Sequence, residues 1–310
     1  MKLVVLNKSL MLNAVALKNP LYDKFEIAAY TSKGKVHAVG VGQFGARQVI
    51  FDNGLKGTLK KKLFSNENFR GIKKDRQYLH EVAYYQLAKY LSIDVVPPTI
   101  LTTYEDVPAS LQLWVFGVAA SGLVPDVFKK SIENWKEKVA LFTAQVNMEK
   151  LRDIILLDLI TNNTDRHGKN IIIDIISNNV WAIDNGLSFG KYFSKYYNVF
   201  HKYIYRKNFT LTTNERAVLE SLTLQQIQSI LHRYLTVEEI EQTFKRMQFI
   251  LKQKDLGFEI LCKEHEGRND FPSYEEWFKT VDKPNKVLLA INKMGILTSN
   301  STMLDGQVKI

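Results

Sequence analysis

The clearest hydrophobic pattern lies in the middle of the chain. Residues 154–160 form an almost unbroken apolar run, which predicts the end of a buried helix. Two shorter apolar runs follow at 171–175 and 180–183, and their β-branched residues favour strands. The polar residues 177–179 between them are typical of a turn. The pattern therefore predicts a helix followed by a β-hairpin, and a hairpin brings its two outer ends to the same place.

The first third of the chain alternates short apolar segments with turn residues, a pattern that predicts β-structure. Asn53-Gly54 is a strong hairpin-turn signal among them. Residues 65–75 are mostly charged or polar and are predicted to form a loop. A helix is expected over about residues 76–91, where apolar side chains recur every three or four positions. The expected strands cover residues 25–30, 35–39, 48–51, 55–63, 99–103 and 110–116.

From about residue 125 the chain is predicted to be mainly helical outside the hairpin. Thr236 and Glu239 have the T-x-x-E spacing of a capping box, which marks the start of a helix. Strands therefore dominate the first part of the chain and helices the second, which predicts an α+β protein. The expected helices cover residues 132–147, 149–160, 213–233, 236–253 and part of 273–295.

A dense group of polar residues stands at the ends of the predicted hairpin. Asp165 and Asn170 follow the helix in a D-x-x-x-x-N pattern, and Asp184-Asn185-Gly186 follows the second strand. Such clusters also occur in ordinary loops, but here the hairpin would bring the two patterns together. Phosphoryl transfer needs a carboxylate that orients or deprotonates the acceptor hydroxyl, and oxygen ligands for Mg²⁺. We therefore predict Asp165 as the catalytic carboxylate, with Asn170 and Asp184 as magnesium ligands.

The block N-T-D-R-H-G-K-N, followed by A-I-D-N-G-L-S-F, resembles two groups of atypical kinases, the HipA-like protein kinases and the phosphatidylinositol 3- and 4-kinase-like enzymes. Asn185 stands where typical protein kinases have Phe. The resemblance implies a bilobal protein-kinase-like fold that uses ATP and Mg²⁺. It implies an N-terminal nucleotide-binding lobe over residues 1–116 and a helical C-terminal catalytic lobe over residues 117–310.

Gly40, Gly42 and Gly45 form a G-x-G-x-x-G pattern between predicted strands. No helical pattern follows it, which argues against a dinucleotide-binding fold. In a kinase-like lobe these glycines are expected to cover the phosphates of ATP, although three glycines also mark plain turns.

The strand at 55–63 carries three consecutive lysines, of which a kinase-like fold uses one to hold the α- and β-phosphates. Alternation along a strand puts Lys60 and Lys62 on one face and Lys61 on the other. Lys60 is the preferred candidate, because the segment 57–60 resembles the G-V-F-K of the phosphatidylinositol-kinase-like family. Glu81, in the helix that follows, is expected to pair with it.

Five further residues are candidates with two readings each. Gln112, Trp114 and Val115 lie where the fold binds adenine, but such strand residues are more often plain core. Arg166 is expected either to steady the catalytic loop or transferring phosphate, or to pair with a nearby acid. His167 flanks Asp165, and a zinc trio of His167, Asp165 and Asp184 is rejected because the magnesium interpretation uses the same carboxylates.

Composition narrows the function only slightly. The 310 residues are 45% hydrophobic and 24% charged, as in ordinary globular proteins. No apolar run approaches the roughly 18–20 residues that span a bilayer, and the N-terminus lacks the pattern of a secretory signal. The single cysteine, Cys262, excludes an internal disulfide and agrees with a cytoplasmic location. The net charge of +10 is compatible with several anionic partners and with a plain lysine-rich surface.

The sequence thus predicts an ATP- and Mg²⁺-dependent kinase that acts on Ser or Thr of a protein, including itself. The alternatives are a kinase for a phosphatidylinositol headgroup or small molecule, and a pseudokinase or AMP-transferring enzyme on the same fold. The basic and aromatic residues 191–207 are expected to dock onto the helical lobe rather than to bind an anionic substrate. HipA-like toxins act with a DNA-binding antitoxin, but their long N-terminal region is not evident here, so neither that partner nor DNA binding is predicted.

Overall fold

A computed structural model of the chain describes residues 4–5, 34–38, 46–120, 147–174, 176–190 and 210–252. Three groups of predictions lie outside these residues: the strand at 25–30, the helices at 132–147 and 273–295, and the segment 191–207. Within the described residues, no helix combines the length and the apolar character needed to cross a lipid bilayer.

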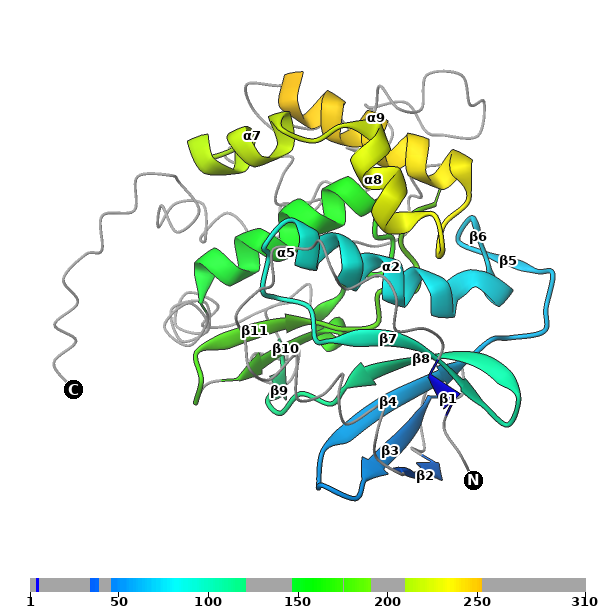
Figure 1. Cartoon of the computed structure of the whole chain (residues 1–310). Coiled ribbons are helices and arrows are strands. Elements are labelled where there is room, and N and C mark those ends of the chain that lie inside the picture. The colour runs from blue at the N-terminus through cyan, green and yellow to red at the C-terminus, as the bar shows by residue number, and fades with distance from the viewer. Residues whose placement is uncertain are drawn as a thin grey trace, which may run out of the picture.

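A six-stranded antiparallel sheet forms the first part of the fold. Its strands follow the order β1-β7-β8-β4-β3-β2, so β4, which carries Lys60, lies near the middle (Figure 1). Leu59 and Leu111 face each other across β4 and β8 and are fully buried. Side chains alternate along a strand, so Lys60 points away from this core. The strands are β1 (Val4–Val5), β2 (Gly34–Ala38), β3 (Arg47–Phe51), β4 (Lys56–Lys61), β7 (Thr99–Tyr104) and β8 (Val107–Leu113).

The segment predicted as a loop over residues 65–75 is a short hairpin, which corrects that prediction. Strands β5 (Asn68–Phe69) and β6 (Ile72–Lys73) pair, and a 3₁₀ turn over Lys74–Arg76 follows. The two turn residues, Arg70 and Gly71, have φ angles of 52° and 80°. A left-handed backbone costs a residue such as arginine roughly 1–2 kcal/mol, so local preference alone does not predict this turn.

Helix α2 (Gln77–Tyr90) lies against the sheet on one side and against α8 (Leu224–Leu231) on the other (Figure 1). Its apolar stripe was expected to bury one face. In the structure more than one face of the helix is buried. Its consecutive residues Val82, Ala83, Tyr84 and Tyr85, together with Leu87, are all at most 2% exposed. Covering by both the sheet and the later helices fixes the position of Glu81 within this helix.

A second, three-stranded sheet contains the predicted hairpin. Strand β10 (Ile171–Asp174) pairs with β11 (Asn179–Ala182) and, on its other edge, with β9 (Val118–Ala119). Residues 114–117 connect this sheet to the six-stranded one. Gly117 has a φ of 146°, and a Cβ at this position would lie 2.5 Å from the carbonyl oxygen of Ile173. Glycine is therefore required where the connection crosses the hairpin.

The described residues after the hairpin and just before it form four further α-helices: α5 (Met148–Thr161), α7 (Thr213–Glu220), α8 and α9 (Val237–Lys252). The single helix predicted over 213–233 is two helices, because Thr223 caps a new helix through a capping box with Gln226. Thr236 and Glu239 form the expected box before α9, at 3.2 Å and 2.7 Å. Side chains of α2, the hairpin and all four helices share one buried cluster, so the α+β prediction is confirmed.

Candidate functional site

The loop with Asp165 leaves α5 through a left-handed residue, Asn162, with a φ of 53°. Thr164 then anchors the loop, because its backbone nitrogen and hydroxyl both donate to the carbonyl oxygen of Leu187, at 3.0 Å and 3.1 Å. The side-chain oxygen of Asn163 accepts from the backbone nitrogen of Asp165 at 2.9 Å. These bonds hold the backbone that carries Asp165.

The register of the hairpin places Asn170 beside Asp184. Ile171 pairs with Ala182, and the backbone nitrogen of Ile183 donates to the carbonyl oxygen of Asn170 at 3.1 Å. The Asn170 side-chain nitrogen also donates to the carbonyl oxygen of Asp165 at 3.0 Å. The three residues with the predicted phosphoryl-transfer pattern therefore lie at one end of the hairpin.

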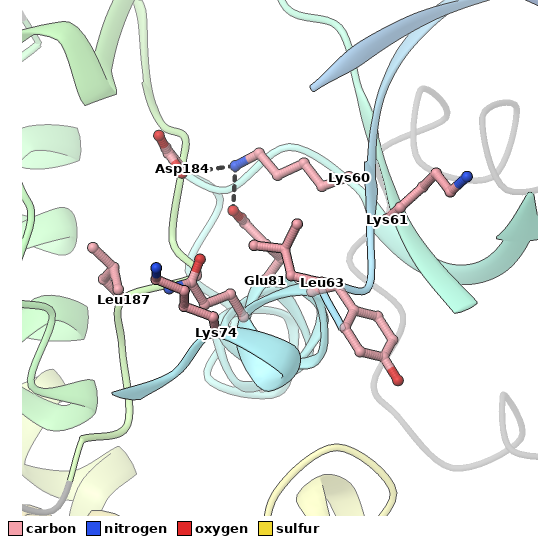
Figure 2. A pocket seen from close by; sticks show the side chains of 10 residues that line it. Lys60, Lys61, Leu63, Lys74, Glu81, Asp184 and Leu187 are labelled. Atoms are coloured by element: carbon pink, nitrogen blue, oxygen red, sulfur yellow. Dashed lines mark hydrogen bonds and ion pairs between the residues drawn. The ribbon is translucent and has the colours of Figure 1, made fainter. Parts of the chain in front are cut away.

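Lys60 connects the two sheets at this end. Its Nζ donates to Oε1 of Glu81 and, at 2.7 Å, to Oδ1 of Asp184 (Figure 2). The Glu81 side chain is 3% exposed and that of Asp184 is 46% exposed. Burial would lower the pKa of the Lys60 ammonium, but the charges of Asp184 and Glu81 outweigh it and raise that pKa. The charge of Lys60 in turn lowers the pKa of Asp184.

Glu81 also holds the turn that follows Asp184. Its Oε2 accepts from the backbone nitrogen of Asn185 at 2.9 Å, so one carboxylate bonds both Lys60 and the turn. Gly186 lets α2 come close here, because a Cβ would lie 3.1 Å from the carbonyl oxygen of Gln77. The D-x-G spacing therefore has a packing reason in this chain.

The other two lysines of the run have different surroundings. Lys61 pairs with Glu105 at 2.8 Å and lies over the ring of Tyr104. Its side chain points away from Glu81 and Asp184 in Figure 2. Lys62 lies over the ring of Phe64, with its Nζ 5.8 Å from the ring centre. Among the three, Lys60 alone forms ion pairs with Glu81 and Asp184 within the part of the chain that the structure describes.

Arg166 is completely buried, which among its expected roles favours steadying the loop and pairing with an acid. Its guanidinium makes a two-pronged ion pair with Asp158 in α5, at 3.0 Å and 3.1 Å. It also donates to the carbonyl oxygens of Asn170 and Ile183, both at 2.8 Å, and to the Asn185 side chain at 2.5 Å. Arg166 therefore holds the loop and the turn in place from the protein interior. The same guanidinium pairs with an acid and steadies the loop, so these two expected roles coincide.

His167 stays near Asp165 without a direct hydrogen bond to it. Its Nε2 lies 3.9 Å from Oδ1 of Asp165, its side chain is 36% exposed, and its Nδ1 accepts from the Lys169 backbone at 3.3 Å. Across the described ranges, no group of three or more His, Cys, Asp or Glu residues is placed to hold a metal ion.

The three residues predicted for the adenine rim divide into two kinds. Gln112 is 8% exposed and donates to the Thr99 hydroxyl at 2.9 Å, so its amide is used within the sheet. Trp114 and Val115 are half-buried in the connection between the two sheets, where a kinase-like fold has its hinge. The glycines Gly40, Gly42 and Gly45 lie outside the described residues.

The sequence did not single out Arg70, although it is a contact of Asp165. Its Nη1 pairs with Oδ1 of Asp165 and donates to the Thr164 carbonyl oxygen at 3.1 Å. The only sign of a hairpin here was the Arg-Gly pair inside a charged segment, and Arg-Gly is a weaker signal for a two-residue turn than Asn-Gly.

A pocket lies between β4, α2 and the Asp184 turn (Figure 2). Of the lysines that line it, Lys60 turns its ammonium to Glu81 and Asp184, so an anionic ligand would meet this cation and a metal would meet carboxylate oxygens. The residues that line it are Lys60, Lys61, Leu63, Lys74, Gln77, Tyr78, Glu81, Asp184, Gly186 and Leu187.

The donor atoms fit a hard cation such as Mg²⁺. Asn170 uses its side-chain nitrogen on Asp165, which leaves its amide oxygen, and Asp184 uses Oδ1 on Lys60. Within the described residues, neither the Asn170 oxygen nor Oδ2 of Asp184 takes part in a hydrogen bond. Magnesium at a nucleotide site typically takes one or two protein oxygens and completes its shell with phosphates and water.

Comparison with known proteins agrees with this arrangement. The family model described as phosphatidylinositol 3- and 4-kinase matches residues 124–254, which include α5, the Asp165 loop, the hairpin and helices α7–α9. No curated protein sequence matches the chain. The chain has an atypical kinase-like fold, and a kinase-type phosphotransferase is the activity that the family match supports.

Three solved structures are similar at low identity. The Golgi casein kinase with Mn/ADP bound is 14% identical, with a TM-score of 0.49 over 80% of this chain and 77% of that chain. The Helicobacter pylori proinflammatory kinase CtkA is 12% identical, with a TM-score of 0.48 over 76% of this chain and 97% of that chain. Another structure of the Golgi casein kinase is 15% identical, with a TM-score of 0.47 over 87% of this chain and 86% of that chain. Similarity of this degree says nothing about the acceptor or the metal of the present chain.

Proposed function

We propose that this protein transfers the γ-phosphoryl group of ATP, with Mg²⁺, to a Ser or Thr hydroxyl of a protein, its own chain included. One observation carries the proposal. Lys60 bonds Glu81 and Asp184 at the same end of the hairpin where Asp165 and Asn170 lie. Kinase-type phosphoryl transfer needs this combination of a phosphate-binding lysine, its partner glutamate, metal ligands and a catalytic carboxylate.

Each residue has a chemical task in this mechanism. Lys60 has three N–H donors, and Glu81 and Asp184 take two of them, which leaves one for a phosphate oxygen of ATP. Asn170 and Asp184 would hold Mg²⁺, which neutralises charge on the phosphate oxygens when bound. Asp165 would orient the acceptor hydroxyl and take its proton as the new O–P bond forms.

A second candidate acceptor is the headgroup of a phosphatidylinositol. The family match over residues 124–254 and the net charge of +10 favour it. The likeness of the 163–170 block to HipA-like protein kinases supports a protein acceptor instead. The two acceptors differ in what becomes labelled, so one experiment separates them.

The test incubates the full chain with Mg²⁺ and γ-labelled ATP, with and without vesicles that contain phosphatidylinositol. Asp165→Asn is the inactive variant, and Asp174→Asn is the matched control, because Asp174 lies on the exposed far end of the same hairpin. We expect the intact mass of wild type and Asp174→Asn to rise by one phosphoryl group, and that of Asp165→Asn to stay unchanged.

The other outcomes discriminate between the alternatives. Label in the lipid alone would favour the phosphatidylinositol headgroup. A mass increase of one AMP group would indicate nucleotidyl transfer. ATP binding without transfer to protein, lipid or an added Ser/Thr peptide would support a pseudokinase, and absence of ATP binding would overturn the proposal.

A further inference from the structure

The β5–β6 hairpin reaches from the lobe that carries Lys60 to the loop that carries Asp165. It lies in the chain between β4 and α2, the two elements that supply Lys60 and Glu81. At its tip, the guanidinium of Arg70 pairs with Oδ1 of Asp165 and donates to the carbonyl oxygen of Thr164 at 3.1 Å. The side chains of Arg70 and Asp165 are only 21% and 17% exposed, so the pair is largely shielded from water.

The backbone at the tip gives a second, independent observation. Arg70 has a φ of 52° in a two-residue turn that usually contains Asn-Gly. Arginine has no local preference for this left-handed conformation, and strained residues of this kind gather at functional sites. The strand after the turn is well anchored, because Ile72 is 2% exposed. A stable hairpin therefore holds a locally unfavourable residue against Asp165.

The other basic residues of this segment do not take the same position. Lys74 pairs with Glu67, whose side chain is 73% exposed, and Lys73 faces solvent. Among the described residues, only Arg70 and His167 bring a cationic or ionisable nitrogen within 4.0 Å of the Asp165 carboxylate.

We propose that Arg70 is a positioning residue for Asp165, an inference that rests on the proposed function. Arg70 holds Oδ1, and within the described residues Oδ2 has no hydrogen bond, so Oδ2 is the oxygen turned to the acceptor hydroxyl. During transfer the acceptor oxygen bonds the γ-phosphorus, the bond from that phosphorus to the bridging oxygen of ADP breaks, and the hydroxyl proton passes to Oδ2. Arg70 keeps the carboxylate in the orientation for this step.

The decisive variant is Arg70→Asn. It removes the guanidinium and creates the Asn-Gly pair that a two-residue hairpin turn prefers, so folding is expected to be kept or improved. Lys73→Gln, on the neighbouring exposed position, is the matched control. We expect Arg70→Asn to lower kcat about tenfold to hundredfold, which is the usual effect of a misplaced catalytic group, with the KM for ATP within about twofold. Arg70→Lys should recover part of kcat, because it retains a cation.

A double variant separates positioning from a general structural effect. Asp165→Asn is expected to keep only a trace of transfer, too slow to change the intact mass but measurable with γ-label in a long incubation. Adding Arg70→Asn in this background should cause no further loss of that rate, because the two residues act as one unit. Thermal unfolding of Arg70→Asn should occur at or above the wild-type temperature.

Four results would overturn the inference. Three concern Arg70→Asn alone: a kcat equal to that of wild type, an increased kcat, which would make the contact inhibitory, or a raised KM for ATP with unchanged kcat. The fourth is a further loss of transfer rate when Arg70→Asn is added to Asp165→Asn. Absence of phosphoryl transfer in wild type would overturn the proposed function and this inference with it, so the two failures are distinguishable.

Discussion

At the scale of single residues, Lys60, Lys61 and Lys62 show how position in a strand decides the role of a side chain. All three follow one another in the sequence, and alternation was enough to predict that Lys60 and Lys61 point in opposite directions. Glu81 was expected as a partner of Lys60 from the resemblance to kinases, whereas the bond to Asp184 was not. The two partners are 21 and 124 residues away in the sequence, and the folded chain brings both to Lys60.

Lys60→Gln is expected to weaken ATP binding about tenfold to hundredfold, since a charged hydrogen bond to phosphate is worth about 1.5–3 kcal/mol. Lys61→Gln is the matched control, because Lys61 pairs with Glu105 instead. The measurement is the rise in unfolding temperature on addition of ATP and Mg²⁺. Equal losses in the two variants would contradict the assignment of Lys60.

Arg166 was assigned two roles from the sequence because an arginine beside a catalytic aspartate suits either. Burial decides between them: its guanidinium bonds Asp158 inside the helical core. Arg166→Met is therefore expected to lower the free energy of unfolding by about 3–5 kcal/mol, because it leaves Asp158 buried without a counter-charge.

Chemical denaturation of Arg166→Met would measure that loss, and the double variant Arg166→Met with Asp158→Leu is its control. Removing both charges should restore part of the stability, as replacement of a whole buried pair usually does. A single variant as stable as wild type would show that the pair contributes nothing.

At the scale of elements, the sequence predicted strands and helices where apolar periodicity was strong, and missed them where it was absent. The hairpin β10–β11 and helices α2, α5 and α9 lie within a few residues of their predicted bounds. The β5–β6 hairpin was missed because its strands have two residues each. Helices α7 and α8 were merged because the break over residues 221–223 is short and contains Leu222.

Helix α2 is linked to α9 by a partly buried charged contact. Nε2 of His80 lies 3.1 Å from Oε1 of Glu239, and Arg76 donates to Oε2 at 3.1 Å. Burial would raise the pKa of Glu239, but the hydrogen bond to His80 and the charges of His80 and Arg76, with a backbone bond at Thr236, lower that pKa to about 2. The helix that holds Glu81 is thus fixed to the last described helix of the fold.

This link predicts an acid dependence of stability. A carboxyl with a folded pKa of about 2 and an ordinary value of 4.5 stabilises the protein above pH 4.5, and the contribution is lost as pH falls toward 2. The full contribution is on the order of 3 kcal/mol. Glu239→Gln should therefore be less stable than wild type at pH 7, with a difference that shrinks between pH 4.5 and 2.

Glu241→Gln, at an exposed position on the same helix, is the control and should follow wild type at every pH. Urea unfolding at a series of pH values would measure the differences. A gap between wild type and Glu239→Gln that stays constant with pH would contradict the role of this carboxyl.

Gly186, in the turn after Asp184, lies close to the start of α2. A methyl group there would lie 3.1 Å from the backbone oxygen of Gln77, whereas at Gly190 its nearest neighbour would be the Ile72 side chain at 3.5 Å. Gly186→Ala should push Glu81 away from Lys60 and lower kcat about tenfold, and Gly190→Ala should have a much smaller effect. Steady-state kinetics of the two variants, with their unfolding temperatures, tests this.

At the scale of the whole molecule, the position of the site could be predicted because both of its motifs lie at the ends of one hairpin. The D-x-x-x-x-N and D-x-G patterns are local, and the strand register that joins them follows from the turn between the strands. The contact of Arg70 could not be predicted, and an acidic partner was expected for Arg166 without its identity, because both contacts depend on how separate elements pack. The assignment of residues 1–116 and 117–310 to two lobes stays a prediction.

The hydrogen bonds of Arg166 have a consequence for how the protein unfolds. They join the loop, the turn and α5, and apolar side chains of α5 belong to the main buried cluster. Surface loops usually open by local fluctuation well before the core does, but this loop lacks that independence. Amide exchange of Thr164, Ile183 and Asn185 should therefore be as slow as that of α5, and activity in urea should vanish at the same midpoint as helicity. The site then has the stability of the core, and no partly denatured form keeps the fold while losing the site.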